Sequence, residues 1–166
     1  NTSIATNKIM TKNEIAQLAK NVSNKIFNNK SIRGEYNKIG RGLWEDLPGT
    51  LKEVKSISSL VKENKVVTGE DVSETIIKKM SHEGKLAKYK IIHFATHGYI
   101  DNDIPEMSAI VLSQESEDIN DGYLNISEIS DLNLESDLVV LSACNTGIGK
   151  LYHGGGVMNI ANSFFN

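Results

Sequence analysis

The sequence predicts an α/β fold, a three-layer sandwich in which helices cover both faces of a largely parallel central sheet. Two observations lead to this prediction. Short apolar runs occur within 90–96, 108–113 and 137–143, and such runs are typical of strands that are buried on both faces. The segments between them carry apolar residues three or four positions apart, which indicates helices. Strands that alternate with helices favour a sheet sandwiched between helical layers.

The N-terminal part of the chain predicts one helix followed by an irregular stretch. Thr11 and Glu14 have the spacing of a capping box, which marks the start of a helix. Apolar residues then recur at helical spacing and form one stripe: Ile15, Leu18, Ala19, Val22 and Ile26. Residues 31–49 are rich in glycine and charge, include the single tryptophan, Trp44, and are expected to be irregular.

The middle of the chain predicts a second helix, a short strand and a third helix. Thr50 and Glu53 have the spacing of another capping box. The apolar stripe expected behind it consists of Leu51, Val54, Ile57, Leu60 and Val61. Residues 65–68 have the composition of a short strand. Either Asp71 or Ser73 is a suitable cap for the helix that follows.

The C-terminal half predicts loops around two further helices. The acidic stretch 114–121 is expected to be a loop, and Asn125 with Glu128 caps a short helix. The glycines within 147–156 indicate a loop after the strongest strand. A last helix is expected to carry Val157, Ile160, Ala161, Phe164 and Phe165.

Length and composition exclude several classes of protein. The 166 residues suit one domain, and 39% hydrophobic with 23% charged residues excludes collagen-like and disordered chains. The net charge of −3 does not favour nucleic acid or an anionic membrane surface as a partner. Apolar runs are only a few residues long, too short for a membrane-spanning helix. We therefore expect a cytoplasmic protein that contacts neither nucleic acid nor membrane directly.

A histidine and the single cysteine follow two of the predicted strands. In a sheet of this kind the reactive residues lie beyond the carboxyl ends of the strands. His97-Gly98 follows the run 90–96, and Cys144 follows the run 137–143. A thiolate next to an imidazole can attack a carbonyl carbon, while the imidazole takes and returns the proton. The backbone N–H groups of Gly98 and Cys144 are candidates to stabilise the resulting oxyanion.

Simpler interpretations exist for each of these residues. A lone cysteine after a buried strand is often a small core residue, and it excludes an internal disulfide. His93 lies within an apolar run and is more typical of a core histidine than of a metal ligand. A zinc site formed by His93, His97, Cys144 and His153 is therefore disfavoured. The segment 147–150 lacks the spacing of a phosphate-binding loop, so we expect neither a metal nor a cofactor.

Several ordered blocks of the sequence resemble the CHAT family, the caspase-like cysteine peptidase domains that are often attached to tetratricopeptide repeats. The block 93–98, His-Phe-Ala-Thr-His-Gly, resembles the histidine motif of that family, and 138–147, which contains Cys144, resembles its cysteine motif. Further blocks in the same order are 47–54, 108–113, 121–129 and 155–164. The resemblance runs from about residue 43 to the end. It divides the chain into an N-terminal helix and linker (1–42) and a caspase-like domain (43–166).

The resemblance implies a cysteine endopeptidase that acts on a protein substrate. In that pattern Cys144 is the nucleophile, His97 is the general base and Gly98 contributes to the oxyanion hole. His93 would be structural, and no third catalytic residue is required. The resemblance also implies an activating partner, either another protein or an attached tetratricopeptide-repeat region.

Two departures from the family pattern bear on these expectations. Three glycines, 154–156, stand where the family often has Gly-Glu-Gly. The family continues past its last helix into strands that build the substrate cleft, so we expect the fold to be incomplete at the C-terminus. The alternative is a non-catalytic caspase-like module that binds a protein partner. A nucleotide-binding α/β domain would need the phosphate loop that is missing.

Overall fold

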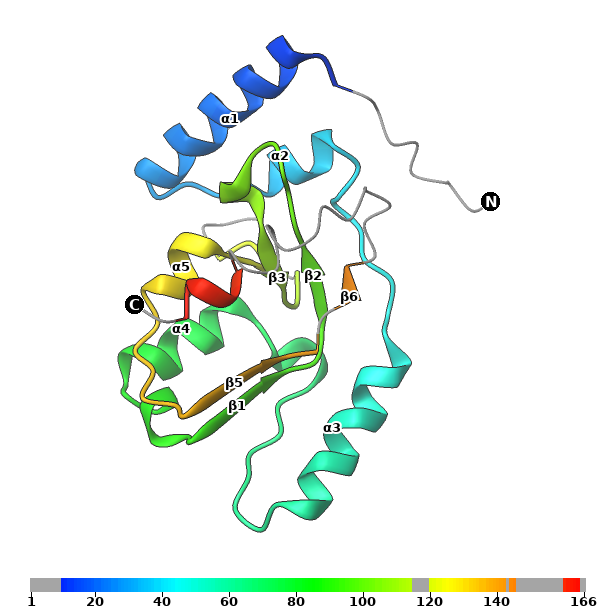
Figure 1. Ribbon diagram of the computed structural model, residues 1–166, viewed down its shortest axis with the longest axis vertical. Coiled ribbons are helices and arrows are strands. Elements are labelled where there is room, and N and C mark those ends of the chain that lie inside the picture. Colours follow the sequence, from blue (N-terminus) through cyan, green and yellow to red (C-terminus); the bar gives the residue numbers. More distant parts are fainter. Residues whose placement is uncertain (1–9, 115–119, 143, 146–159, 165–166) are drawn as a thin grey trace.

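A computed structural model describes residues 10–114, 120–142, 144–145 and 160–164 of the chain (Figure 1). The α-helices are α1 (Lys12–Phe27), α2 (Arg33–Lys38), α3 (Pro48–Leu60), α4 (Glu74–His82) and α5 (Ile126–Ser130). The strands are β1 (Ile91–Phe94), β2 (His97–Tyr99), β3 (Ala109–Val111), β4 (Tyr123–Asn125), β5 (Leu138–Leu141) and β6 (Cys144–Asn145). Short 3-10 turns lie at Gly69–Asp71, Leu86–Lys88 and Pro105–Met107.

The strands form a parallel pair, β1 with β5, and a ladder in the order β4-β3-β2-β6. The backbone N–H of Ser142, which follows β5, donates to the carbonyl of Phe94 at the end of β1 at 2.8 Å and extends the parallel pair by one residue. The α/β class and a parallel pairing are thus confirmed. The prediction of a largely parallel sheet is wrong for one half, because β2, β3 and β4 pair antiparallel. The connection from β2 to β3 is shorter than the dozen or more residues that a parallel crossover needs.

Hydrophobic clusters lie on both faces of the ladder, because side chains alternate along a strand. On β3, Ala109 and Val111 belong to one cluster and Ile110 to the other. The first cluster takes Leu18 and Val22 from α1 together with Ile32, Tyr36, Tyr99, Ile104, Met107 and Tyr123. The second takes Ile77 and Met80 from α4 and Ile129 from α5, together with Leu86, Phe94, Leu112, Leu124 and Ile160. Helices therefore pack on both faces, as Figure 1 shows for α1 and α2 on one side and α4 and α5 on the other.

Three of the predicted helix starts are confirmed. Thr11 and Glu14 form the capping box of α1, and Asn125 with Glu128 forms that of α5. The Ser73 hydroxyl accepts from the backbone N–H of Ile76 at 3.3 Å and caps α4.

The predicted start of α3 is wrong. This helix begins at Pro48 after Leu47, and Thr50 donates its hydroxyl to the Leu47 carbonyl at 2.8 Å instead of capping the helix. Proline is favoured in the first helical turn because the missing N–H would have no partner there. The carboxylate of Glu53 does not return to the start of the helix but contacts His93 and Ser142.

Two other elements differ from the prediction. Residues 65–68 are not a strand in the structure, although their composition favours one. Conversely, the stretch 31–49 contains α2, which carries the fully buried Tyr36. The ring of Tyr36 stacks on Tyr123 of β4 with centroids 3.7 Å apart. For α2, this contact joins residues that lie far apart in the sequence.

The turn predicted at Asp121-Gly122 is present. Gly122 has a φ of 88°, and a Cβ atom there would lie 2.7 Å from the carbonyl oxygen of Ser113. Only glycine fits this position without strain. The loops predicted within 115–119 and 147–156 and the start of the last helix lie outside the described residues; residues 160–162 are helical.

None of the helices in the described part of the chain is both long enough and apolar enough to cross a membrane.

Candidate active site

The pairing of the strands sets His97 directly beside Cys144. Across the ladder, Cys144 of β6 pairs with His97 of β2, His97 with Val111 of β3, and Val111 with Tyr123 of β4. We call these four positions the site row. Neighbouring strands lie about 4.8 Å apart. The structure therefore brings together the backbone of the two residues that the sequence singles out, which are 47 positions apart in the chain.

The histidine lies inside the ladder, not beyond the end of a strand as the sequence suggested. The chain breaks its strand geometry at Ala95 and Thr96, and His97 then begins β2. The strand before the break, β1, pairs with β5. The strand after the break, β2, pairs with β3 and β6. The Thr96 hydroxyl donates to the carbonyl of Val111 at 2.5 Å and fastens the break to β3.

The imidazole of His97 is buried, with 8% of the residue exposed, and one of its nitrogens has a defined partner. Nε2 lies 2.6 Å from the backbone carbonyl oxygen of Glu45. A carbonyl can only accept, so Nε2 carries the hydrogen and donates it. In the neutral ring Nδ1 is then the nitrogen with the lone pair. Nδ1 is buried and has no hydrogen-bond partner among the described residues.

The segment that supplies this carbonyl also supplies an aromatic contact. The ring of Trp44 lies 5.0 Å from the His97 ring, at an interplanar angle of 42°. Sequence reasoning did not assign either neighbour to the site. The Glu45 contact is made by a backbone group, which no side-chain pattern reveals, and the only signal for Trp44 was that it is the single tryptophan.

Gly98, the predicted oxyanion donor, follows His97 in β2. It pairs with Ile110 on one side and with Asn145 on the other. The glycine is therefore flanked by backbone on both sides, next to the cysteine-bearing strand. Its role in binding an oxyanion stays a prediction.

His93 belongs to a separate hydrogen-bonded group. Its Nε2 lies 2.9 Å from Oε1 of Glu53 on α3, and the hydroxyl of Ser142 donates to Oε2 of the same carboxylate at 3.1 Å. The ring is partly buried and engaged, which suits the structural role expected of it. The Glu53 carboxylate thereby links α3 to β1 and to the residue that follows β5.

This carboxylate is the main polar anchor of α3 that the structure describes. None of the residues of α3 is buried, and Leu51, Ile57 and Leu60 are exposed. We expect Glu53→Ala to leave the free energy of unfolding within about 1 kcal/mol of the parent value, because partly exposed ion pairs contribute little. Backbone amides in α3 should exchange with deuterium about tenfold faster, because the helix loses its tether.

Hydrogen exchange measured by mass spectrometry tests this expectation. Glu63→Ala is the matched control, because this exposed residue has no partner among the described residues. Equal exchange in α3 for both variants would show that Glu53 does not hold the helix.

Asp101, which follows β2, is engaged in its own turn. It accepts from the Tyr99 hydroxyl at 2.6 Å and from the backbone N–H of Ile104 at 2.9 Å. Within the described ranges, no cluster of three or more His, Cys, Asp or Glu side chains could hold a metal ion. His153 lies outside those ranges.

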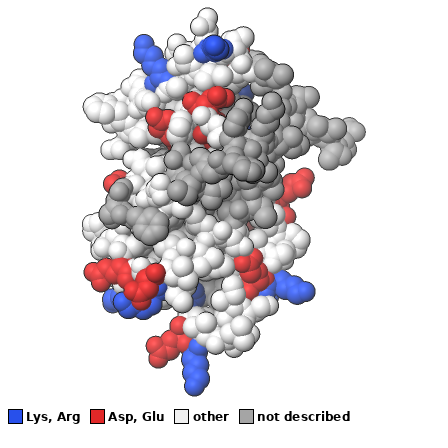
Figure 2. Space-filling view, viewed as in Figure 1, with Lys and Arg blue, Asp and Glu red and all other residues white. Residues whose placement is uncertain are grey.

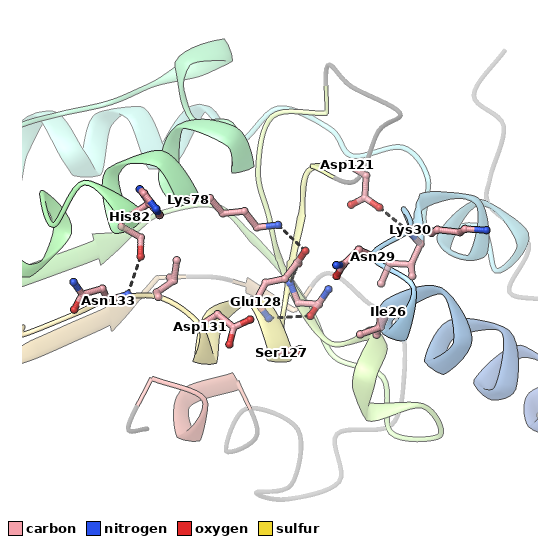
Figure 3. Close-up of a pocket in the computed structure, with 14 residues that line it drawn as sticks. Ile26, Asn29, Lys30, Lys78, His82, Asp121, Ser127, Glu128, Asp131 and Asn133 are labelled. Carbon is pink, nitrogen blue, oxygen red and sulfur yellow. Dashed lines mark hydrogen bonds and ion pairs between the residues drawn. The ribbon is translucent and has the colours of Figure 1, made fainter.

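A pocket of about 590 Å³ lies elsewhere, between the end of α1, α4 and α5 (Figure 3). Lys78 on its wall lies 2.8 Å from Glu128 and 2.6 Å from Glu74, so its charge is already paired. Neither His97 nor Trp44 lines this pocket.

On the face shown in Figure 2, acidic and basic side chains of the described residues are interspersed, in keeping with the small net charge.

A comparison with protein families identifies the class of this chain. The model of the CHAT domain matches residues 4–166, and the chain therefore belongs to the CHAT domain family, which is related to caspase-like peptidases. The match begins well before residue 43, and both α1 and α2 contribute to the first hydrophobic cluster. No curated protein and no solved structure matches the chain.

Proposed function

We propose that this chain is a cysteine endopeptidase domain that hydrolyses peptide bonds of a protein substrate through Cys144 and His97. One observation carries the proposal. The pairing of β2 with β6 sets His97 opposite Cys144, and the described residues leave Nδ1 of His97 without a partner. A buried nitrogen with a free lone pair beside a cysteine is the arrangement that a general base requires. Membership of the CHAT family supports the same reaction class.

The proposed reaction uses these groups in two stages. The Cys144 thiol gives its proton to Nδ1 of His97, and the thiolate attacks the carbonyl carbon of the scissile peptide bond. The tetrahedral intermediate collapses, the C–N bond breaks, and the imidazolium returns its proton to the departing amine. Water, deprotonated by the same imidazole, then attacks the thioester, and collapse releases the carboxylic acid and the thiol.

The Glu45 carbonyl would stabilise the imidazolium between these stages, because Nε2 keeps donating to it throughout. Backbone N–H groups of Gly98 and Cys144 are proposed to bind the oxyanion of each tetrahedral intermediate. Both residues lie on adjacent strands, β2 and β6. We further propose that a partner protein or an attached tetratricopeptide-repeat region activates the domain in the cytoplasm, as the family resemblance implies.

Labelling with a thiol-reactive peptide ketone tests the proposal directly. Cys144 is the single cysteine, so covalent labelling of the chain reports on one thiol. We expect Cys144→Ala to abolish labelling. His97→Ala should slow it by about 10²- to 10⁴-fold, the usual contribution of a general base.

His82→Ala is the matched control, because this exposed histidine lies on α4, away from the site row, and should label within twofold of the parent. The measurement is the second-order rate constant over a range of probe concentrations, with and without candidate activating partners. If His97→Ala labels as fast as the His82→Ala control, His97 is not the base. If the parent chain neither labels nor cleaves peptides under any of these conditions, the chain is not an active peptidase.

A further inference from the structure

The segment before α3 is fastened to the sheet by the hydroxyl of Tyr123. This hydroxyl donates to the carbonyl of Arg41 at 2.5 Å and accepts from the indole N–H of Trp44 at 3.1 Å. One side chain therefore holds two points of the segment 41–45. The next residue along, Glu45, presents the carbonyl that meets His97.

Tyr123 is well placed to act as a fixed anchor. It is fully buried, and its ring stacks on Tyr36 at an interplanar angle of 12°. It also belongs to the site row, two strands away from His97. A fully buried side chain that is stacked in this way cannot change its rotamer without disturbing the first hydrophobic cluster.

Trp44 connects this anchor to the imidazole. Its indole N–H is held by Tyr123, and its ring lies against the ring of His97. The same tryptophan packs edge-on against Tyr99, with ring centroids 6.4 Å apart. The His97 ring is thus confined by an aromatic ring whose own position is set by a hydrogen bond.

We propose that Tyr123 and Trp44 are positioning residues that hold His97 in the tautomer with the hydrogen on Nε2, leaving Nδ1 as the base. This inference rests on the proposed function for its catalytic consequence. Tyr123 fixes the segment 41–45, the segment fixes the Glu45 carbonyl, and the carbonyl accepts only from a protonated Nε2. In neutral imidazole the tautomer is set by the hydrogen bond that the other nitrogen makes.

Removing the Tyr123 hydroxyl should therefore change the tautomer of His97 while leaving the fold intact. In Tyr123→Phe the ring and its stacking remain, while the Arg41 carbonyl and the Trp44 N–H lose their common partner. The Glu45 carbonyl is then free to shift, and both tautomers of His97 become accessible. Only the tautomer with an unprotonated Nδ1 serves as the base toward Cys144.

The test combines NMR spectroscopy with labelling kinetics on the full chain. In a Cys144→Ala background, nitrogen-15 NMR of the histidine rings reports the tautomer of His97 without interference from the thiol. With the cysteine present, the labelling rate with the peptide ketone reports the catalytic consequence. Tyr123→Phe and Trp44→Phe are the test variants, and the second serves if the first folds poorly.

Tyr36→Phe is the matched control. It removes a hydroxyl from the same cluster, one that donates to the Met107 carbonyl at 2.7 Å and does not touch the segment 41–45. We expect the parent and Tyr36→Phe to show mainly Nε2–H. Tyr123→Phe and Trp44→Phe should show a substantial Nδ1–H population and label about tenfold more slowly, since small misplacements of a catalytic group are costly.

The two proposals fail in different ways. If the tautomer of His97 is the same in Tyr123→Phe, Trp44→Phe and Tyr36→Phe, the positioning role is wrong even if Cys144 reacts rapidly. If the tautomer changes as expected but the parent chain never reacts, the positioning role stands and the peptidase function is wrong.

Discussion

Asp121→Ala should lower the free energy of unfolding by about 3–5 kcal/mol. The buried Oδ2 of Asp121 accepts from the backbone N–H groups of Ile32 and Arg33, at 2.9 and 3.0 Å, and from the hydroxyl of Ser31 at 2.7 Å. Its Oδ1 accepts from the backbone N–H of Tyr123 at 3.1 Å. Alanine leaves the buried N–H groups of Ile32 and Tyr123 without this acceptor, while the Arg33 N–H keeps the Ser31 hydroxyl at 3.2 Å. Each unsatisfied buried donor costs about 1–3 kcal/mol.

Equilibrium unfolding in urea measures this loss. Asp131→Ala is the matched control, because that carboxylate is exposed and its removal should change stability by no more than about 0.5 kcal/mol. Asp121→Asn should fall between the two, since its amide retains one oxygen for the donors of α2. A loss below about 1 kcal/mol for Asp121→Ala would show that water replaces the carboxylate at this site.

The same carboxylate affects the proposed active site through the chain. It joins the first turn of α2 to the start of β4, immediately beside Tyr123. The segment that holds His97 begins a few residues after α2 ends. Weakening this junction should therefore disturb the site row as well as the fold.

The stability of the protein should fall as the pH rises from about 5 to about 9, and Glu74 should be the main cause. Burial and the neighbouring Glu128 carboxylate raise the pKa of Glu74 to about 8, although Lys78 and the Gly122 N–H oppose this shift. Its Oε1 lies 2.6 Å from Nζ of Lys78, and Oε2 accepts from Gly122 at 2.9 Å. One lysine shared by two carboxylates does not compensate the burial of both charges.

The sign follows from proton linkage. The folded state binds the Glu74 proton more tightly than the unfolded state, so its contribution to stability is complete below the ordinary pKa of 4.5. The contribution is lost as the pH rises through about 8, and it amounts to a few kcal/mol. The pKa of Lys78 is also raised: burial lowers it, but Glu128 and Glu74 outweigh that effect, so Lys78 keeps its charge throughout this range.

Urea unfolding at intervals between pH 5 and pH 9 tests this dependence. Glu74→Gln should show a nearly flat profile, because the amide does not titrate. Glu70→Gln, an exposed glutamate in the preceding 3-10 turn, should keep the slope of the parent. A parent profile that is flat or rises with pH would show that Glu74 is ionised in the folded state at neutral pH.

Local chemistry explains the parts of the fold that the sequence predicts well. Thr11 with Glu14 and Asn125 with Glu128 both form capping boxes, because each box needs only residues three positions apart. The strands β1, β3 and β5 lie within the apolar runs that predict them. These elements carry their own signal in the sequence.

Elements whose signal is distributed over the chain were missed. Glu53 has the spacing of a capping residue, yet it pairs with His93, 40 residues away. The strands β2 and β4 are three residues long, too short for a recognisable period. They exist because β3 lies between them, and pairing of this kind is a property of the assembled sheet.

The candidate site likewise contains residues that the sequence predicts and residues that it does not. His97 and Cys144 were predicted from their positions after apolar runs, and the structure brings the backbone of both residues to neighbouring strands. The Glu45 carbonyl could not be predicted, because every residue has one and only the tertiary structure selects it. The proposed role of Tyr123 could not be predicted from the sequence either, because this residue contacts Trp44 and not His97 itself.

The site row also determines which kinds of sequence change the protein can tolerate. The row is aligned by strands of two or three residues, and the alternation along β3 sends Val111 to one face and Ile110 to the other. Inserting or deleting a single residue within β2 or β3 would therefore place part of one strand out of step with the other by one position and turn side chains of the site row to the opposite face. We expect natural relatives to vary in length within the loops and to keep the residue count within these short strands constant.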